Sequence, residues 1–136
     1  AAIKYGNFNK LLGFKLDANL QITAPNILDR TIPEQPELVA KKEDLIRGEQ
    51  LYNLSCGPCH GGNAKSAGVL PDLRMMSTET HRIFKNIVVD GIYAGKGMAG
   101  FGDILNEKDT EMIRQYVISR ALIDKAEAEA MSAGGG

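Results

Sequence analysis

The sequence predicts a mainly α-helical fold with three principal helices, preceded by a short strand-forming segment and an extended connector. Apolar residues recur at three- and four-residue spacing in three stretches, near 42–56, 77–91 and 106–122. Before these stretches, Pro25, Pro33 and Pro36 oppose regular structure. The 136 residues are enough for one domain with one modest core. We therefore expect a single helical domain with an N-terminal extension.

The composition excludes several classes of protein. The net charge is −1, which gives no reason to expect nucleic acid or an anionic membrane surface as a partner. No apolar run approaches the roughly 18 residues of a membrane span. The first residues lack the charged-then-apolar order of a signal peptide. We expect that a signal has been removed or that the sequence is a piece of a longer chain.

The first 41 residues divide into two segments. Residues 1–24 predict one or two short strands, because residues 11–17 alternate roughly between apolar and polar and turn-forming residues flank them. A lone hairpin is marginal in water, so this segment needs a partner. Residues 25–41 predict an extended connector or a strap laid over a surface.

The helical domain is expected over residues 42–122. Its first helix, about 42–56, has an apolar stripe that includes Ile46, and Gly48 on this face would let another helix approach closely. A second helix begins after an N-cap at Ser77 or Thr78 and ends at Gly91.

A third helix is expected to begin near Asn106, with Asp109 completing an imperfect capping box. Its buried face is predicted at Ile113, Tyr116, Val117 and Ala121. Residues 123–136 form an Ala- and Glu-rich tail that we expect to be frayed or disordered.

The main chemical signal is Cys56-x-x-Cys59-His60, a pattern typical of covalent haem c attachment. The two thiols can form thioethers with the haem vinyl groups, and the adjacent imidazole can then reach the iron. A thioredoxin-like site would need a βαβ setting, and zinc would need a second Cys/His pair. A disulfide is possible but would not account for His60.

The iron needs a second axial ligand, and Met98 is the favoured candidate. It lies in a glycine-rich loop between two helices, where a thioether can fold back over the haem. Met75, Met76 and His81 remain alternatives, although His81 is expected to be an exposed polar residue. His/Met ligation raises the reduction potential and closes the iron to oxygen, which favours electron transfer over catalysis.

Two further residues are candidates for the haem surroundings. A backbone carbonyl near Pro71 would accept the Nδ1–H of His60 and orient its ring. Arg74 would pair with a haem propionate, or else face solvent.

The order of these features resembles a class I cytochrome c over residues 42–122. Residues 68–74, 87–91 and 97–101 more closely resemble the C-terminal haem c domain of quinohaemoprotein alcohol dehydrogenases, which join a quinone-containing β-propeller to a haem domain. This resemblance implies the class I fold, with three helices around one covalent haem. It also implies attachment at Cys56 and Cys59, axial ligation by His60 and Met98, and weaker roles for Pro71 and Arg74.

The resemblance also implies a function. Residues 10–16 look like the last propeller strand, and 18–40 like the interdomain connector. The implied role is to relay single electrons from pyrroloquinoline quinone (PQQ), expected only in an upstream dehydrogenase domain, to a small redox protein or terminal oxidase. No residue here would be catalytic. A covalent haem and stable thiols fit an oxidising compartment, so we expect the periplasm. A free-standing shuttle cytochrome is the alternative, and a haem enzyme or gas sensor is a third interpretation.

Overall fold

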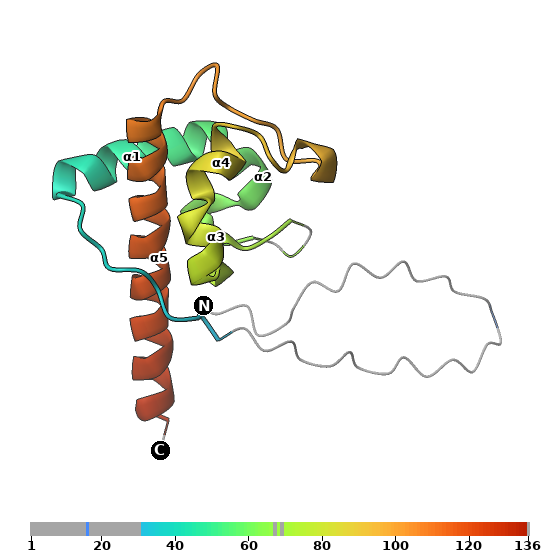
Figure 1. Cartoon of the computed structure of the whole chain (residues 1–136). Helices are drawn as coiled ribbons and strands as arrows, with labels where there is room; N and C mark the ends of the chain where they lie inside the picture. The colour runs from blue at the N-terminus through green and yellow to red at the C-terminus, as the bar shows by residue number, and fades with distance from the viewer. Residues whose placement is uncertain (1–15, 17–30, 67, 69, 136) are drawn as a thin grey trace.

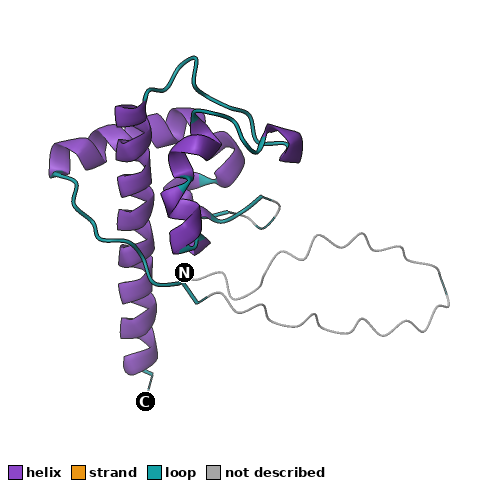
Figure 2. Cartoon of the chain, in the orientation of Figure 1, coloured by secondary structure: helices purple, strands orange, loops and turns teal. Residues whose placement is uncertain are grey.

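The computed structural model describes residues 16, 31–66, 68 and 70–135. The regular secondary structure of these residues is all helical, with no strand among them (Figure 1 and Figure 2). The α-helices are α1 (Lys42–Ser55), α2 (Gly57–His60), α3 (Thr78–Arg82), α4 (Phe84–Val88) and α5 (Glu107–Ala133), and the 3-10 turns are η1 (Gly62–Ala64), η2 (Leu73–Met75) and η3 (Ala94–Lys96). The mainly α fold is confirmed. The strands expected in residues 1–24 fall, except for Leu16, outside the described residues.

α1 runs across α5, and these two helices make the main contact of the fold (Figure 1). At their contact Gly48 is buried, and a Cβ there would collide with the carbonyl group of Met112 and lie 3.2 Å from the Cβ of Tyr116. The close approach expected at Gly48 is confirmed. Ile46 does not share this buried stripe, since 48% of its surface is exposed.

The start of α5 follows the local sequence signals. The Asn106 side chain accepts a hydrogen bond from the Asp109 backbone at 2.9 Å, and Asp109 accepts one from the Asn106 backbone at 3.4 Å. This reciprocal capping satisfies two backbone N–H groups of the first turn. All four residues of the predicted core face are buried, namely Ile113, Tyr116, Val117 and Ala121.

The far end of α5 corrects one expectation. The tail at 123–136 was expected to fray, but α5 continues through it to Ala133. Alanine and glutamate are among the strongest helix formers, and the helix is already nucleated by its packed first half. Asp124 and Lys125 also make ion pairs with residues outside α5, which hold the start of the tail in place.

The second predicted helix is divided into α3 and α4. Ser77 is its N-cap and accepts a hydrogen bond from the Thr80 backbone at 3.2 Å. The backbone departs from helical geometry at Ile83, and α4 follows immediately. The bend allows both halves to bury side chains: His81 from α3, and Phe84, Ile87 and Val88 from α4.

Residues 31–41, which we call the strap, have no helix or strand and lie over α5 (Figure 1). Ile32 is buried. The side-chain carbonyl of Gln115 accepts hydrogen bonds from the backbone N–H groups of Val39 at 3.0 Å and Ala40 at 3.3 Å. An exposed ion pair joins Glu34 to Lys125 at 3.2 Å. The described part of the connector is therefore fastened to the helical domain.

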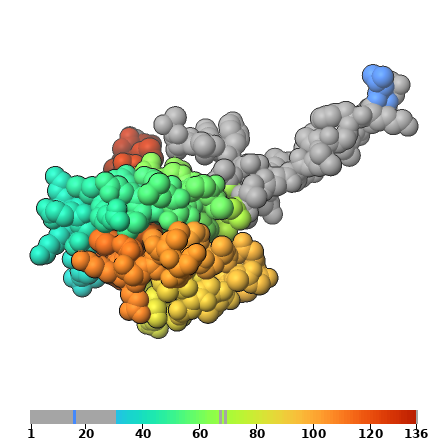
Figure 3. All heavy atoms as spheres, turned by 90° about the horizontal axis from the view of Figure 1, so that it is seen from above, coloured from blue at the N-terminus to red at the C-terminus, as the bar shows by residue number. Residues whose placement is uncertain are grey.

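Viewed from above, the green surface of α1 and α2 borders the orange and yellow surface of the later segments (Figure 3). The helix that carries the Cys-His motif thus lies beside the residues that lead into α5. In the described part of the chain, no helix combines the length and apolar character needed to cross a bilayer.

Candidate functional site

The Cys56–His60 motif occupies a single tight turn directly after α1. The backbone N–H groups of Cys59 and His60 both donate to the carbonyl of Cys56, at 3.1 and 2.8 Å. Pro58 stands in the first turn of α2, where a missing N–H costs no helical bond. Both thiols and the imidazole are therefore presented from a segment of five residues.

The two cysteines are free thiols in different environments. Cys56 is buried in the core and Cys59 is exposed. Burial, with a smaller contribution from Cys59, raises the pKa of the Cys56 thiol to about 11. A redox-active C-x-x-C pair needs a lowered thiol pKa, and the pKa of Cys56 is shifted in the opposite direction. A zinc site has no support either, because the described residues contain no cluster of three or more potential metal ligands.

His60 is buried and its ring is oriented by one hydrogen bond. Its Nδ1 lies 2.8 Å from the backbone carbonyl oxygen of Pro71. A carbonyl can only accept, so Nδ1 carries the proton and Nε2 keeps the lone pair that binds a metal. A ligand histidine usually needs such a bond to fix its tautomer. The structure thus contains the carbonyl contact expected near Pro71.

The loop after His60 is held by two tyrosines. The hydroxyl of the fully buried Tyr52 donates to the carbonyl of Gly61 at 2.7 Å, and its ring centroid lies 5.3 Å from that of Tyr116. Gly61 has φ of +83°, and a Cβ there would meet the Lys65 carbonyl, so the turn requires glycine. These contacts fix the chain on the C-terminal side of the motif.

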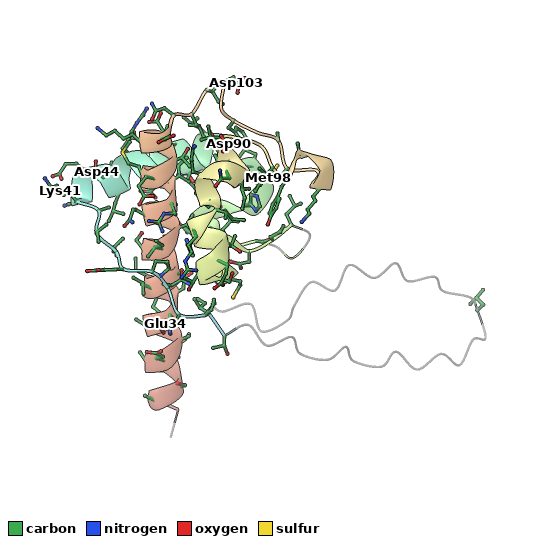
Figure 4. The ribbon with its side chains drawn as sticks, in the orientation of Figure 1. Glu34, Lys41, Asp44, Asp90, Met98 and Asp103 are labelled. Carbon is green, nitrogen blue, oxygen red and sulfur yellow. The ribbon has the colours of Figure 1, made fainter. Side chains whose placement is uncertain are left out.

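Met98 lies on the loop between α4 and α5 (Figure 4). It is half-buried and packs against the core cluster that contains Cys56. Its backbone N–H donates to the carbonyl of Tyr93 at 3.2 Å, and the preceding Gly97 has φ of +91°, a conformation favoured by glycine. A loop anchored in this way holds a thioether beside the apolar core.

The other methionines have different surroundings. Met76 is a buried member of the core cluster, and Met75 is half-buried within η2. Met112 packs against the core from α5, and Met131 is exposed on the tail.

Arg74 is buried within an ion-pair network. Its Nε and Nη2 donate to the two oxygens of Asp72 at 3.0 and 2.6 Å, and its Nη1 donates to Asp124 at 2.7 Å. The partners found here are thus protein carboxylates, and the alternative of a solvent-facing Arg74 is wrong. The pairing with a propionate stays a prediction. The sequence did not indicate Asp124 as a partner, because no local pattern links Arg74 to a residue 50 positions later. Asp72 lies only two residues before Arg74, and its pairing was missed although it is local.

His81 corrects another expectation. It was expected to be exposed, yet only 3% of its surface is accessible and neither ring nitrogen has a hydrogen-bond partner. Desolvation and the nearby Arg114 lower the pKa of His81 to about 4. Together with Arg82, Lys85 and Glu107, it lines a cavity of about 440 Å³ between α3, α4 and the start of α5.

The residues present fit a covalent haem. Two free thiols stand three residues apart, and the adjacent imidazole has its Nδ1 proton already engaged. The Met98 thioether packs against the apolar core cluster of which Cys56 is a member. Thiols, imidazole and thioether are the groups by which proteins attach haem and ligate its iron.

Comparison with known proteins agrees with this chemistry. Residues 43–117 match the family model described as cytochrome C oxidase, cbb3-type, subunit III. The chain is 37% identical over 119 residues to quinohemoprotein alcohol dehydrogenase ADH IIB of Pseudomonas putida, covering 87% of this chain and 17% of that protein. It is 36% identical over 76 residues to cytochrome c550 of Pseudomonas aeruginosa, covering 53% of this chain and 52% of that protein.

A solved structure gives the same result. The quinohemoprotein alcohol dehydrogenase ADHIIG from Pseudomonas putida matches with a TM-score of 0.64 and 38% identity, covering 76% of this chain and 15% of that chain. The present chain spans about a sixth of the length of these quinohemoprotein relatives. Because the family model covers more than half of the chain and the helical fold agrees with the solved relative, the chain belongs to the cytochrome c family, with a class I fold and a covalent haem c.

Proposed function

We propose that this chain relays single electrons from the quinone site of a dehydrogenase to an external acceptor. The observation that carries the proposal is the 2.8 Å hydrogen bond between His60 Nδ1 and the Pro71 carbonyl, beside both thiols. This bond leaves Nε2 as the metal-binding nitrogen of a ring that cannot easily rotate.

Four side chains would hold the haem. Cys56 and Cys59 would attach it through thioethers, and His60 and Met98 would be the two protein ligands of the iron. The haem supplies a one-electron iron couple. A thioether ligand favours Fe(II) and raises the potential, and an iron with both axial positions filled has no place for a substrate. This chain would therefore transfer electrons and would not itself act on an alcohol.

The proposed partners follow from the relatives. Those named quinohemoprotein alcohol dehydrogenases are about six times longer than the matched region, so the remainder of such a protein would hold PQQ and the substrate site. The acceptor would be a small redox protein or a terminal oxidase, and the compartment would be the periplasm.

A free-standing shuttle cytochrome is the second candidate. It is supported by the similarity to cytochrome c550, of which the matched region covers about half. The axial ligands would be the same in both cases, and only the donor would differ.

Absorption spectroscopy tests the ligation. We expect the oxidised haem-loaded protein to show the long-wavelength band of a Met–Fe(III) bond, and Met98→Ala to lose it and to bind carbon monoxide rapidly when reduced. Met76→Leu is the matched control, since Met76 is a buried alternative ligand, and it should keep the band. Fast and complete carbon monoxide binding by the unmodified protein would instead support a haem enzyme or gas sensor.

Stopped-flow reduction tests the donor. A purified PQQ-dependent alcohol dehydrogenase, reduced with its alcohol, should reduce the haem in one-electron steps at a rate that saturates with dehydrogenase concentration. No reduction by this donor, with normal reduction by a membrane cytochrome complex, would favour the free-standing shuttle.

A further inference from the structure

The segment that follows the Pro71 carbonyl is held in one conformation by hydrogen bonds among its own residues. The Asp72 carboxylate accepts hydrogen bonds from the backbone N–H of Arg74 at 3.1 Å and from two nitrogens of its guanidinium. The backbone N–H of Met75 donates to the Asp72 carbonyl at 3.0 Å, which completes the turn η2. One planar side chain therefore fixes the conformation of the residues that directly follow Pro71.

The same side chain joins this segment to the rest of the fold. Nη1 of Arg74 donates to Asp124 on α5 at 2.7 Å, and the exposed fractions of the two side chains are only 7% and 14%. The Arg74 carbonyl also accepts a hydrogen bond from Gln35 of the strap at 3.3 Å. Arg74 is thus the common member of contacts to Asp72, to α5 and to the strap.

We propose that Arg74 is a positioning residue for the iron: by bridging Asp72 and Asp124 it fixes the Pro71 carbonyl that holds the His60 ring. Arg74 acts through the backbone of residues 71–74 and does not itself touch the iron. This inference rests on the proposed role of His60 as an axial ligand.

A physical consequence follows for the reduction potential. A firm hydrogen bond from Nδ1 to a carbonyl makes the imidazole a stronger donor to the metal, which stabilises the oxidised iron. Loosening residues 71–74 weakens that bond, so the potential should rise. Removing the positive charge of Arg74 would by itself favour the oxidised iron and lower the potential. The two effects have opposite signs, and a variant that keeps the charge separates them.

Arg74→Lys is that variant, because it keeps the charge but loses the fork that binds Asp72 through two nitrogens. Arg120→Lys is the matched control: Arg120 also pairs with Asp124, at 3.0 Å, from within α5. In the haem-loaded protein, we expect R74K to shift the oxidation equilibrium threefold or more toward reduction, about 30 mV upward for a one-electron couple. R120K should leave the potential unchanged.

A second readout reports on the hydrogen bond itself. Proton NMR of the oxidised protein follows the hyperfine-shifted ring N–H of His60, and its exchange with solvent should be about tenfold faster in R74K than in R120K, as expected when a bond worth about 1.4 kcal/mol is lost. Asp124→Asn removes the ion pair between Arg74 and α5 and should also speed the exchange of the His60 ring N–H. This second variant tests the proposal even if R74K does not fold.

The potentials and exchange rates of the variants decide between support and rejection. A raised potential with faster exchange in R74K, and neither change in R120K, supports the proposal. Equal potentials and exchange rates in R74K and R120K overturn it, as does unchanged exchange in D124N. Absence of hyperfine shifts on the His60 ring in the unmodified protein would instead defeat the proposed ligation, and with it this inference.

Discussion

At the scale of single residues, Gly48 sets the distance between α1 and α5. Its missing side chain lets the Met112 carbonyl approach the backbone of α1, a contact that any Cβ would prevent. The sequence could suggest this role, because Gly48 lies on an apolar helical face. It could not identify Met112, because that contact depends on how two helices far apart in the sequence cross.

We predict that Gly48→Ala destabilises the haem-loaded protein by roughly 1–3 kcal/mol, because the helices must separate to admit the methyl group. The intrinsic helix preference of alanine offsets about 1 kcal/mol of that strain. Urea unfolding measures the change. Gly95→Ala is the control, since a Cβ at Gly95 meets no atom within 4 Å. Equal stability of the two variants would contradict the prediction.

His81 is a buried imidazole without a hydrogen-bond partner. Arg114 of α5 opposes its protonation and Glu111 favours it to a lesser extent, while burial has the largest effect. Arg82, Lys85 and Glu107 also line the adjoining cavity. The folded protein thus holds this ring neutral at pH values where an unfolded chain would protonate it.

This difference predicts a pH dependence of stability. The pKa of His81 is about 4 in the folded protein and 6.5 for an ordinary histidine. Between pH 4 and pH 6.5 the unfolded chain therefore binds a proton on His81 that the folded protein does not. Stability should therefore be complete above about pH 6.5 and fall by roughly 2–3 kcal/mol on acidification toward pH 4. His81→Leu should remove this component from the unfolding free energy measured by urea titration at each pH. The same slope in both proteins would show that His81 does not titrate in this way.

At the scale of elements, the predictable features are the local ones. The Ser77 and Asn106 caps and the apolar stripe of the third helix need only neighbouring residues, and the structure contains them. The extension of α5 to Ala133 was missed although the Ala- and Glu-rich tail favours a helix locally. The ion pairs that hold the start of the tail could not be predicted, because the partners of Asp124 and Lys125 are far away in the sequence. Helix caps and apolar periodicity depend on neighbouring residues and can be predicted from them. Ion pairs between distant segments depend on the fold and cannot.

The strap is attached to α5 through the side chain of Gln115, which bonds its backbone. Gln115 is 2% exposed, and its Nε2 donates to Glu111 at 2.9 Å while its carbonyl accepts two bonds from the strap. No pattern in residues 31–41 indicates this partner, because the acceptor comes from the opposite half of the chain.

We predict that Gln115→Leu weakens the attachment of the strap and lowers the unfolding free energy by roughly 1–3 kcal/mol, since two backbone N–H groups lose their acceptor. Lys125→Ala is the control. It removes the Glu34 ion pair, whose glutamate is 92% exposed, and should cost at most about 1 kcal/mol. Amide exchange at Val39 and Ala40 should accelerate in Q115L alone. Protected amides in Q115L would show that the strap is held by other contacts.

At the scale of the whole molecule, the described core cluster contains three aromatic rings, Tyr52, Phe84 and Tyr116, among mostly aliphatic side chains. The largest fully buried residues of the described chain include one aromatic ring, Tyr52, and otherwise Ile, Val and Thr. The sequence contains no Trp, and 6% of its residues are aromatic. A haem would add a large apolar surface that the polypeptide itself does not supply.

We therefore predict that the Cys56→Ala/Cys59→Ala variant, which cannot attach haem, loses most of its cooperative unfolding transition, because ligand binding and folding are coupled. Circular dichroism during heating measures this. Met131→Leu, an exposed change on the tail, should behave like the unmodified protein. A sharp transition with full helical signal in the double variant would mean that the protein core is sufficient without haem.

The contacts of α5 have a consequence for how the molecule opens. Through Gln115 this helix bonds the strap, through Tyr116 it reaches the loop after His60, and through Asp124 it bonds Arg74. Each of these segments can loosen alone, but none can keep its contact if the long helix moves away. Opening of α5 should therefore release the connector, the loop after His60 and the Arg74 segment together, which makes this helix the part of the molecule whose local unfolding disturbs the haem surroundings most.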